Sequence, residues 1–217
     1  MLSNVETTRY QPRIHMEYKN YVRGKTAVIV GDSSGIGLAT AALLSSYGAR
    51  VFFAAQSSDE LAYAFATVAQ DGGQWDGTVV DLQQSSDVRR LFILASSRLG
   101  KIDLFVQPLP LEASEADIPF LREILQHMNR GGHIVQVRLG QIMKTITNTS
   151  EQVRTAALRH DARAQGVHLT RIEPSAGDYR DLSYSLNSLD AVQVAQYVYE
   201  SLSQPFGVDV VFLPGQI

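Results

Sequence analysis

The sequence predicts one α/β domain, in which a doubly wound parallel sheet of about seven strands carries helices on both faces. From Lys25 onward, short apolar runs without a polar face alternate with amphipathic stretches. This alternation is typical of buried parallel strands joined by crossover helices. A glycine-rich turn separates the first apolar run from the first amphipathic stretch, as in folds that bind a nucleotide at the end of the first strand.

The predicted strands are short runs rich in β-branched, aromatic and aliphatic residues. Such a run is buried on both sides in a parallel sheet, so it needs no polar alternation. The seven predicted strands are 26–30, 50–55, 77–80, 102–106, 133–137, 167–172 and 208–213.

The predicted helices lie between these strands and have apolar residues at helical spacing. Ser57 and Glu60 form the pattern of a capping box, which opens the second helix. Gly100 and Gly166 are suited to end two others, because glycine readily adopts the left-handed conformation that closes a helix. The predicted helices are 35–47, 57–69, 88–99, 119–129, 150–165 and 189–202.

Composition and charge narrow the function classes. The 217 residues suit one domain at 25–217, preceded by a polar N-terminal arm at 1–24. A net charge of −3 gives no basic face for nucleic acid, and the absence of cysteine excludes disulfides and thiolate metal sites. The chain has no apolar run long enough for a membrane span, and its N-terminus does not resemble a secretory signal, so we expect a cytoplasmic protein. We also expect its partner to be a small-molecule substrate.

The glycine-rich turn reads Gly31-Asp-Ser-Ser-Gly35-Ile-Gly37. The first glycine permits a tight turn, and the later ones let backbone amides approach a pyrophosphate and let the helix pack closely on the sheet. The turn therefore predicts a phosphate-binding site; the alternative is a glycine turn that serves packing alone. The predicted binding residues here are Gly31, Ser33, Ser34, Gly35, Ile36 and Gly37.

Over about residues 25 to 214 the chain resembles the short-chain dehydrogenase/reductase family, which has a Rossmann-like fold. The resemblance rests on the glycine spacing and on four further segments: Gly48-Ala-Arg-Val51, Gly100-Lys-Ile-Asp103, Gly131 to Val135 and Gly166 to Pro174. Asp81-Leu82 is similar to the segment whose Asp contacts adenine in that family.

This resemblance implies a nicotinamide dinucleotide cofactor, or a vestigial site for one. The cofactor preference depends on the end of the second strand, where NAD-binding members carry an acid. Here Ala55 and Gln56 stand at that place, and no carboxylate there repels a 2′-phosphate. NADP is therefore favoured over NAD, with Gln56, Asp81 and Leu82 among the cofactor-binding residues.

The sequence departs from the family where the family keeps its catalytic Ser, Tyr and Lys. Lys144 stands at the Tyr position, Asn148 at the Lys position, and Arg138 with Leu139 where the serines would be. No tyrosine occurs between Tyr63 and Tyr179. The family's Asn-Asn-Ala-Gly is replaced by Gln107-Pro-Leu-Pro110, whose prolines we expect to stiffen a turn after the fourth strand.

The candidate catalytic residues are therefore Arg138 as an anion holder, Lys144 as a proton donor and Tyr179 as a displaced phenol, with Tyr184 as its alternative. Gln107 and Gln141 are expected to line the substrate crevice. The alternative is that these are solvated loop side chains. The histidines show no metal-binding spacing, so no metal site is predicted.

Three functions follow as hypotheses. The first is a non-redox enzyme of the isomerase, cyclase, dehydratase or lyase type, which the altered polar crevice favours. The second is a non-catalytic partner subunit, and the third is an NADP(H)-dependent oxidoreductase with a displaced acid. The resemblance also implies a homodimer or homotetramer, paired through small and apolar helix faces. The alternative is that these faces only cover the sheet of their own chain. Those faces contain Ile124, Met128, Val153, Ala156, Ala157 and Ala164.

Overall fold

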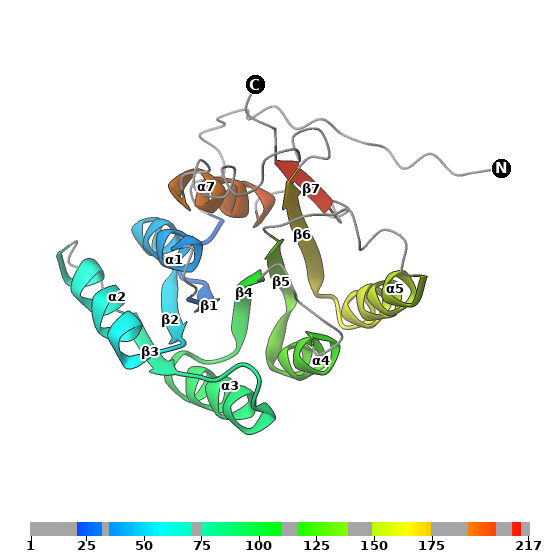
Figure 1. Ribbon diagram of the computed structural model, residues 1–217, viewed down its shortest axis with the longest axis horizontal. Coiled ribbons are helices and arrows are strands. Elements are labelled where there is room, and N and C mark those ends of the chain that lie inside the picture. Colours follow the sequence, from blue (N-terminus) through cyan, green and yellow to red (C-terminus); the bar gives the residue numbers. More distant parts are fainter. Residues whose placement is uncertain are drawn as a thin grey trace.

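The computed structural model describes residues 21–31, 35–70, 75–109, 117–138, 149–174, 191–202 and 210–213. They form a seven-stranded parallel sheet in the order β3-β2-β1-β4-β5-β6-β7 (Figure 1). The predicted fold class is confirmed. The strands are β1 (Thr26–Val30), β2 (Arg50–Ala55), β3 (Trp75–Val79), β4 (Ile102–Leu109), β5 (Met128–Arg138), β6 (His168–Pro174) and β7 (Val210–Leu213).

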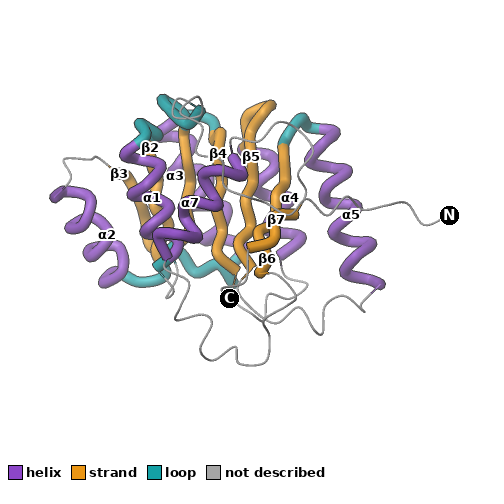
Figure 2. Tube along the Cα trace, turned by 90° about the horizontal axis from the view of Figure 1, so that it is seen from above, coloured by secondary structure: helices purple, strands orange, loops and turns teal. Residues whose placement is uncertain are grey.

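The helices form one layer on each face of the sheet (Figures 1 and 2). The core cluster on one face contains residues of α1, α2 and α7, and the cluster on the other face contains residues of α3, α4 and α5. The helices are α1 (Ile36–Ser46), α2 (Ser58–Gln70), α3 (Ser85–Leu99), α4 (Asp117–His127), α5 (Thr149–Ala164) and α7 (Ala191–Leu202).

The central strands explain why the sequence shows apolar runs instead of alternation. All five residues of β1 are buried, and so are the five residues of β2 from Val51 to Ala55. Phe52 and Phe53 belong to the clusters on opposite faces, so each face receives a phenyl ring from the same strand. Both faces are therefore apolar, as expected for a parallel sheet between two helix layers.

The main difference from the predicted elements lies between α4 and β5. The helix predicted to reach Asn129 ends at His127, and β5 begins at Met128. Met128 pairs with Ile102, and the Asn129 side-chain amide donates to Asp103 Oδ1 over 2.6 Å. These contacts hold the segment in the sheet, so the chain leaves the helix two residues earlier than predicted.

The domain also begins earlier than predicted. Residues 21–24 form a turn, and Val22 is fully buried in the core, whereas the sequence placed the boundary after Gly24. The Lys25 ammonium lies 3.4 Å from the centre of the Tyr21 ring. The end of the predicted arm is thus part of the domain, and residues 1–20 lie outside the described residues.

The described residues proposed for subunit pairing fall into two groups: Ile124 and Met128 are covered within the chain, whereas Ala157 and Ala164 are exposed. Ile124 and Met128 are buried in the core beneath α4, so they cover the sheet. Ala157 is exposed, and Arg122 of α4 pairs with Asp161 of α5 over 3.6 Å. A homo-oligomer stays a prediction. In the described part of the chain, no helix has the length and apolar character needed to cross a membrane.

His133 gives the fold a pH dependence. Its Nε2 lies 2.7 Å from Thr170 Oγ1 and its ring packs edge-on against His168. Burial, followed by the charges of His168 and Lys25, lowers the pKa of His133 from 6.5 to about 3. Between these pH values the unfolded chain binds a proton that the folded chain does not. Stability is therefore complete above pH 6.5 and falls as the pH drops toward 3.

We expect this imidazole to cost the fold about 1.4 kcal/mol for each pH unit within that window. Urea unfolding at pH 7 and pH 5 measures the loss in the wild type and in His133→Gln. The other titrating groups are common to both proteins, so the variant should lose about 2 kcal/mol less over this interval. Equal losses in the two proteins would show that His133 does not carry the dependence.

Candidate functional site

The site region lies at the carboxyl ends of β1 and β4, where the strand order reverses direction. The β1–β4 pairing ends at Ile29 and Val106, whereas the β4–β5 pairing continues to Leu109 and Arg138. The last three residues of β4 thus extend beyond its pairing with β1. In open α/β sheets this reversal point is where ligands bind.

This extension corrects the expected turn at Gln107-Pro108-Leu109. These residues belong to β4 and pair with β5. In the described part of the chain they have a strand on one side only. Pro108 is tolerated because a strand edge does not require its missing N–H.

The glycine-rich turn has the geometry that a phosphate-binding turn needs at two of its glycines. Gly35 begins α1 in the left-handed conformation, with φ 77° and ψ 0°. A Cβ built on Gly35 meets nothing within 4 Å, so the backbone is open to an approaching group. A Cβ on Gly37 would overlap the Val30 carbonyl oxygen, so the start of α1 packs directly on the end of β1. Ile36 is buried in the core cluster on the α1 side of the sheet, whereas Ser33 and Ser34 lie outside the described residues.

The first glycine contacts a carboxylate. A Cβ built on Gly31 would overlap Glu60 Oε1. The other oxygen of that carboxylate, Oε2, accepts the Gln56 backbone N–H over 2.7 Å. Gln56 in turn donates from Nε2 to the Gly31 carbonyl over 3.3 Å. These three residues connect the end of β1, the end of β2 and the start of α2.

Glu60 is a site residue that sequence reasoning assigned to helix capping alone. The capping box is present, since Ser57 Oγ accepts the Glu60 backbone N–H over 3.1 Å. However, the Glu60 carboxylate bonds the N–H of Gln56, one residue before the cap, and so reaches toward the glycine turn. A carboxylate from α2 thus contacts the residue that follows β2, a contact that the sequence reasoning did not foresee. One signal in the sequence could have indicated this contact. Glu60 is an acid in the first turn of the helix that follows β2, and β2 is the strand after the glycine-rich turn.

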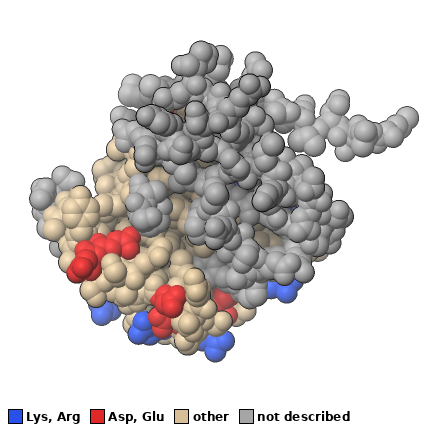
Figure 3. Space-filling model, in the orientation of Figure 1, with Lys and Arg blue, Asp and Glu red and all other residues tan. Residues whose placement is uncertain are grey.

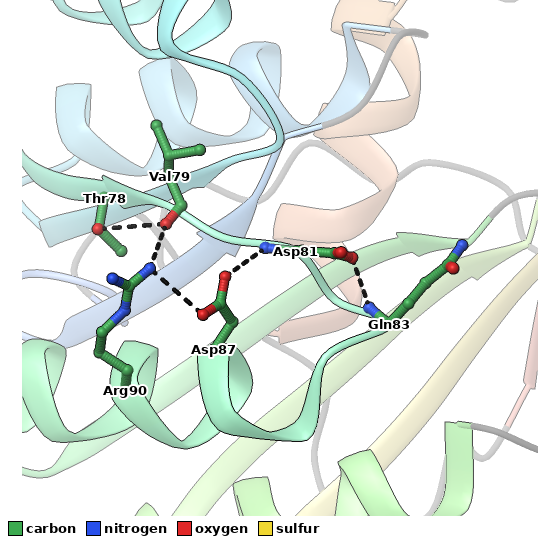
Figure 4. A network of polar contacts seen from close by, with 6 residues as sticks. All are labelled: Thr78, Val79, Asp81, Gln83, Asp87 and Arg90. Atoms are coloured by element: carbon green, nitrogen blue, oxygen red, sulfur yellow. Dashed lines mark hydrogen bonds and ion pairs between the residues drawn. The ribbon is translucent and has the colours of Figure 1, made fainter.

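Asp81 lies just beyond β3 in a fixed loop (Figure 4). Its Oδ1 accepts the Gln83 N–H over 2.9 Å, and its own N–H donates to Asp87 Oδ2 over 3.1 Å. Arg90 pairs with Asp87 and donates to the Val79 carbonyl, which ties α3 to the end of β3. No donor among the described residues bonds Asp81 Oδ2. Leu82 packs on the core beside α3.

Two buried amides lie side by side on the extended strands. Gln107 on β4 pairs in register with Gln136 on β5, and the two residues are 4% and 1% exposed. The side-chain oxygen of each is buried without a hydrogen-bond donor, which is uncommon in a core. Gln107, predicted to line an open crevice, is thus a buried residue. Gln136 escaped notice because only the strand register brings it beside Gln107.

The residues predicted to perform the chemistry are largely outside the described part of the chain. Arg138 is the last residue of β5, opposite Leu109, and its backbone alone is described. Gln141, Lys144 and Tyr179 lie outside the described residues. Within the described residues, no three His, Asp or Glu side chains gather at a metal-binding distance. Of the residues predicted for nucleotide binding, the structure describes Gly31, Gly35 to Gly37, Gln56, Asp81 and Leu82, which follow the carboxyl ends of β1, β2 and β3.

The described residues fit the adenosine diphosphate half of a dinucleotide. Gly35 offers an open backbone at the start of α1, and the close packing at Gly37 fixes that helix against β1. α1 has no acidic side chain in its first turn, so no fixed negative charge there opposes a pyrophosphate. Asp81 supplies a carboxylate after β3, which is separated from β1 by β2. The amino group of a bound base can donate a hydrogen bond to this carboxylate.

A comparison with protein families matches residues 25–109 to the model described as short chain dehydrogenase. This range contains the glycine turn, Glu60, Asp81 and the whole of β4. The second half of the domain, from α4 onward, lies outside the match.

Three curated relatives illustrate the sequence similarity. One is assigned as ketoacyl reductase 1 of the granaticin polyketide synthase of Streptomyces violaceoruber, 27% identical over 65% of this chain and 57% of its own. The 1-deoxy-11-beta-hydroxypentalenate dehydrogenase of Streptomyces avermitilis is 38% identical over 39% of this chain and 31% of its own. An uncharacterised oxidoreductase of Staphylococcus aureus is 24% identical over 86% and 94%. The chain thus spans 57% of the length of the first of these relatives and 31% of the length of the second.

Solved structures share the fold across most of the chain. A metagenomic short-chain oxidoreductase in complex with NADP gives a TM-score of 0.70 at 18% identity, and the match covers 91% of this chain and 99% of that one. The hydroxysteroid dehydrogenase of Escherichia coli gives 0.64 at 20% identity, over 92% and 99%. At this identity the likeness shows the fold alone. The names of the relatives favour the oxidoreductase hypothesis over the non-redox and non-catalytic hypotheses.

Proposed function

The chain belongs to the short-chain dehydrogenase/reductase family, and on this basis we propose that it is an oxidoreductase dependent on a nicotinamide dinucleotide. The observation that carries the proposal is that Gly35 and Gly37, which follow β1, and Asp81, which follows β3, lie at the same edge of one parallel sheet, and we refer to these three residues as the cradle. These residues lie within the part of the chain that matches the family. The relatives named as reductases and dehydrogenases support redox chemistry over the non-redox alternative.

In this proposal the residues of the cradle bind and orient the cofactor. The backbone at Gly35 and the start of α1 receives the pyrophosphate, because the amino end of a helix carries a partial positive charge. Asp81 Oδ2 accepts a hydrogen bond from the adenine amino group, while Gln83 and Asp87 hold the loop in place. Through the extension of β4, Gln107–Leu109 border the region beyond β1 where the rest of the cofactor would continue.

When bound, the cofactor supplies or accepts a hydride at the substrate carbon. The chain must then supply a proton to the carbonyl oxygen, or remove it in the reverse direction. The sequence lacks the family's tyrosine beside the fifth helix, so we assign this proton to the Tyr179 hydroxyl. Arg138, at the end of β5, is proposed to hold the polar end of the substrate, Lys144 to serve as the alternative proton donor, and Gln141 to contact the substrate.

The proposal is tested by hydride transfer. The full chain is mixed with reduced cofactor and a panel of ketones, aldehydes and ketoacyl thioesters, and loss of the reduced cofactor's absorbance is followed. We expect oxidation that depends on one substrate class, with transfer of deuterium from labelled cofactor to product. Binding of the cofactor with no transfer to any member of a broad panel would contradict the redox assignment and favour a non-redox reaction or a partner role.

Assembly and location remain proposals. We propose a homodimer or homotetramer in the cytoplasm, acting on a small molecule and without nucleic-acid or membrane partners. Light scattering of the purified chain tests the assembly. A mass of one chain at micromolar concentration would contradict it.

A further inference from the structure

We propose that Gln107 and Gln136 form a binding site for a primary amide group, so that the substrate of this chain is a carbonyl compound that also bears such an amide. This inference rests on the proposed function, because it names a substrate class for the same region of the sheet. In it, the two glutamine side-chain oxygens accept the two N–H groups of one amide nitrogen.

The two oxygens form a pair of buried acceptors. Gln107 and Gln136 are 4% and 1% exposed, and the Oε1 atom of each has no hydrogen-bond donor in the described part of the chain. A buried amide oxygen without a donor destabilises a fold, so such atoms are rare in native proteins. In a ladder of stacked amides each oxygen accepts an N–H of its neighbour, but these two amides do not bond in this way. The pair thus suits a donor that comes from a ligand.

The pair lies toward the carboxyl edge of the sheet, beside the proposed cofactor region. Gln107 follows Val106, the last residue of β4 that pairs with β1, and it pairs in register with Gln136 of β5. Because side chains alternate along a strand, the two amides share a face with Phe105 and Ile134, which belong to the core cluster under α3, α4 and α5. Apolar residues thus border the amides, as in ligand sites where a few polar groups fix the orientation.

The spacing of the strands suits a group with two N–H bonds on one nitrogen. Neighbouring strands lie about 4.8 Å apart, so the two glutamine side chains leave the sheet at about that separation. A planar NH2 group that donates two hydrogen bonds of about 2.9 Å, about 120° apart, holds its acceptors about 5 Å from each other. A hydroxyl group has one hydrogen to donate, so it satisfies only one of the two oxygens.

A neutral amide fits this site better than an ammonium group. Arg171 of β6 pairs in register with Gln136, so it continues the same row of side chains on the same face of the sheet. Its guanidinium group keeps its positive charge and opposes a second cation. In Figure 3 the acidic side chains of the described surface gather around α2 and α3, whereas this row spans β4, β5 and β6. A primary amide supplies two donors without adding a positive charge.

Binding of acetoacetamide to the full chain tests the inference, with acetylacetone as the matched ligand that carries a methyl group in place of the NH2 group. Nuclear magnetic resonance of the chain, labelled with heavy nitrogen at its glutamine side chains, follows both titrations in the wild type, Gln107→Met, Gln136→Met and Thr40→Val. The signal missing from each methionine variant identifies the amide. Thr40→Val is the matched control, because Thr40 Oγ1 is also buried without a partner among the described residues but lies on α1.

We expect acetoacetamide to shift the signals of both amides with a dissociation constant in the millimolar range, and acetylacetone to bind at least about tenfold more weakly. Each methionine variant should lose about tenfold in affinity for acetoacetamide, whereas Thr40→Val should keep the wild-type value. Each methionine variant should also melt about 2–4 °C above the wild type, as followed by circular dichroism, because it removes a buried acceptor that has no donor.

Equal binding of the two ligands, or unchanged acetoacetamide affinity in both methionine variants, would overturn the inference. A lower melting temperature in both methionine variants would also overturn it, because the two amides would then serve the fold itself. Addition of NADH or NADPH tests the proposed function separately, through transfer of a hydride to the acetoacetamide ketone and of a proton to its oxygen. Reduction of other carbonyl compounds without binding of acetoacetamide would refute the amide site alone. Binding of acetoacetamide through the two glutamines, with no reduction of any carbonyl compound, would support the amide site and contradict the redox assignment.

Discussion

Replacing Gly37 by alanine is expected to lower the free energy of unfolding by about 2 kcal/mol or more, because the added methyl group overpacks a rigid contact. That methyl group would overlap the Val30 carbonyl oxygen, and both partners are fixed in regular structure. To relieve the overlap, α1 must move away from the end of β1, and the open backbone at Gly35 moves with it. We therefore expect dinucleotide affinity to fall together with stability, as measured by urea unfolding and by titration with NADH.

Gly35→Asn is the control for this variant. A side chain at Gly35 meets nothing within 4 Å, and asparagine tolerates the left-handed conformation better than other side chains. Its stability loss should be clearly smaller than that of Gly37→Ala. Equal losses in the two variants would mean that the close approach of helix and strand at Gly37 is not what the glycine provides.

Tyr179→Phe is expected to give the largest change in activity, a fall in kcat of about 10²- to 10⁴-fold, because it removes only the phenol that we assign to proton transfer. The dissociation constant for NADH should stay within about twofold of the wild type, since we propose that Asp81 and the glycine turn bind the cofactor without this phenol. Steady-state kinetics and cofactor titration measure the two effects separately.

Tyr63→Phe is the matched control, because Tyr63 is 66% exposed on α2 and lies outside the proposed site. It should leave kcat unchanged. If Tyr179→Phe is as active as Tyr63→Phe while Tyr184→Phe is inactive, the proton donor is Tyr184. If all three are active, neither tyrosine has the assigned role.

The sequence was sufficient for the fold because its signals are local and repeated. The buried strands read as apolar runs, and Gly100 and Gly166 adopt positive φ at helix ends, as glycine permits. The boundary between α4 and β5 was missed because it depends on partners distant in sequence. Asn129 bonds Asp103, and Met128 pairs with Ile102, and neither contact has a signature near residue 129.

The same distinction holds at the site. The turn at Gly35 and Gly37 could be predicted because it lies between the first strand and the first helix, whereas Asp81 was named from the family resemblance, and the binding roles of all three stay a proposal. Glu60 was identified as a capping residue, but its direction toward Gly31 depends on how α2 lies against the end of β1. Gln136 became visible only through its register with Gln107. Patterns along the chain thus locate backbone features well, whereas side chains that meet across strands require the structure.

We propose that the turn at 31–37 and Asp81 together bind a nicotinamide dinucleotide. Isothermal titration of the full chain with NADH, beside Asp81→Ala, tests it most directly. We expect one site per chain with a dissociation constant in the micromolar range, competed by ADP-ribose, and binding weakened about tenfold in Asp81→Ala by the lost hydrogen bond to adenine. No heat of binding at millimolar NADH, or equal affinity in the two proteins, would contradict the account.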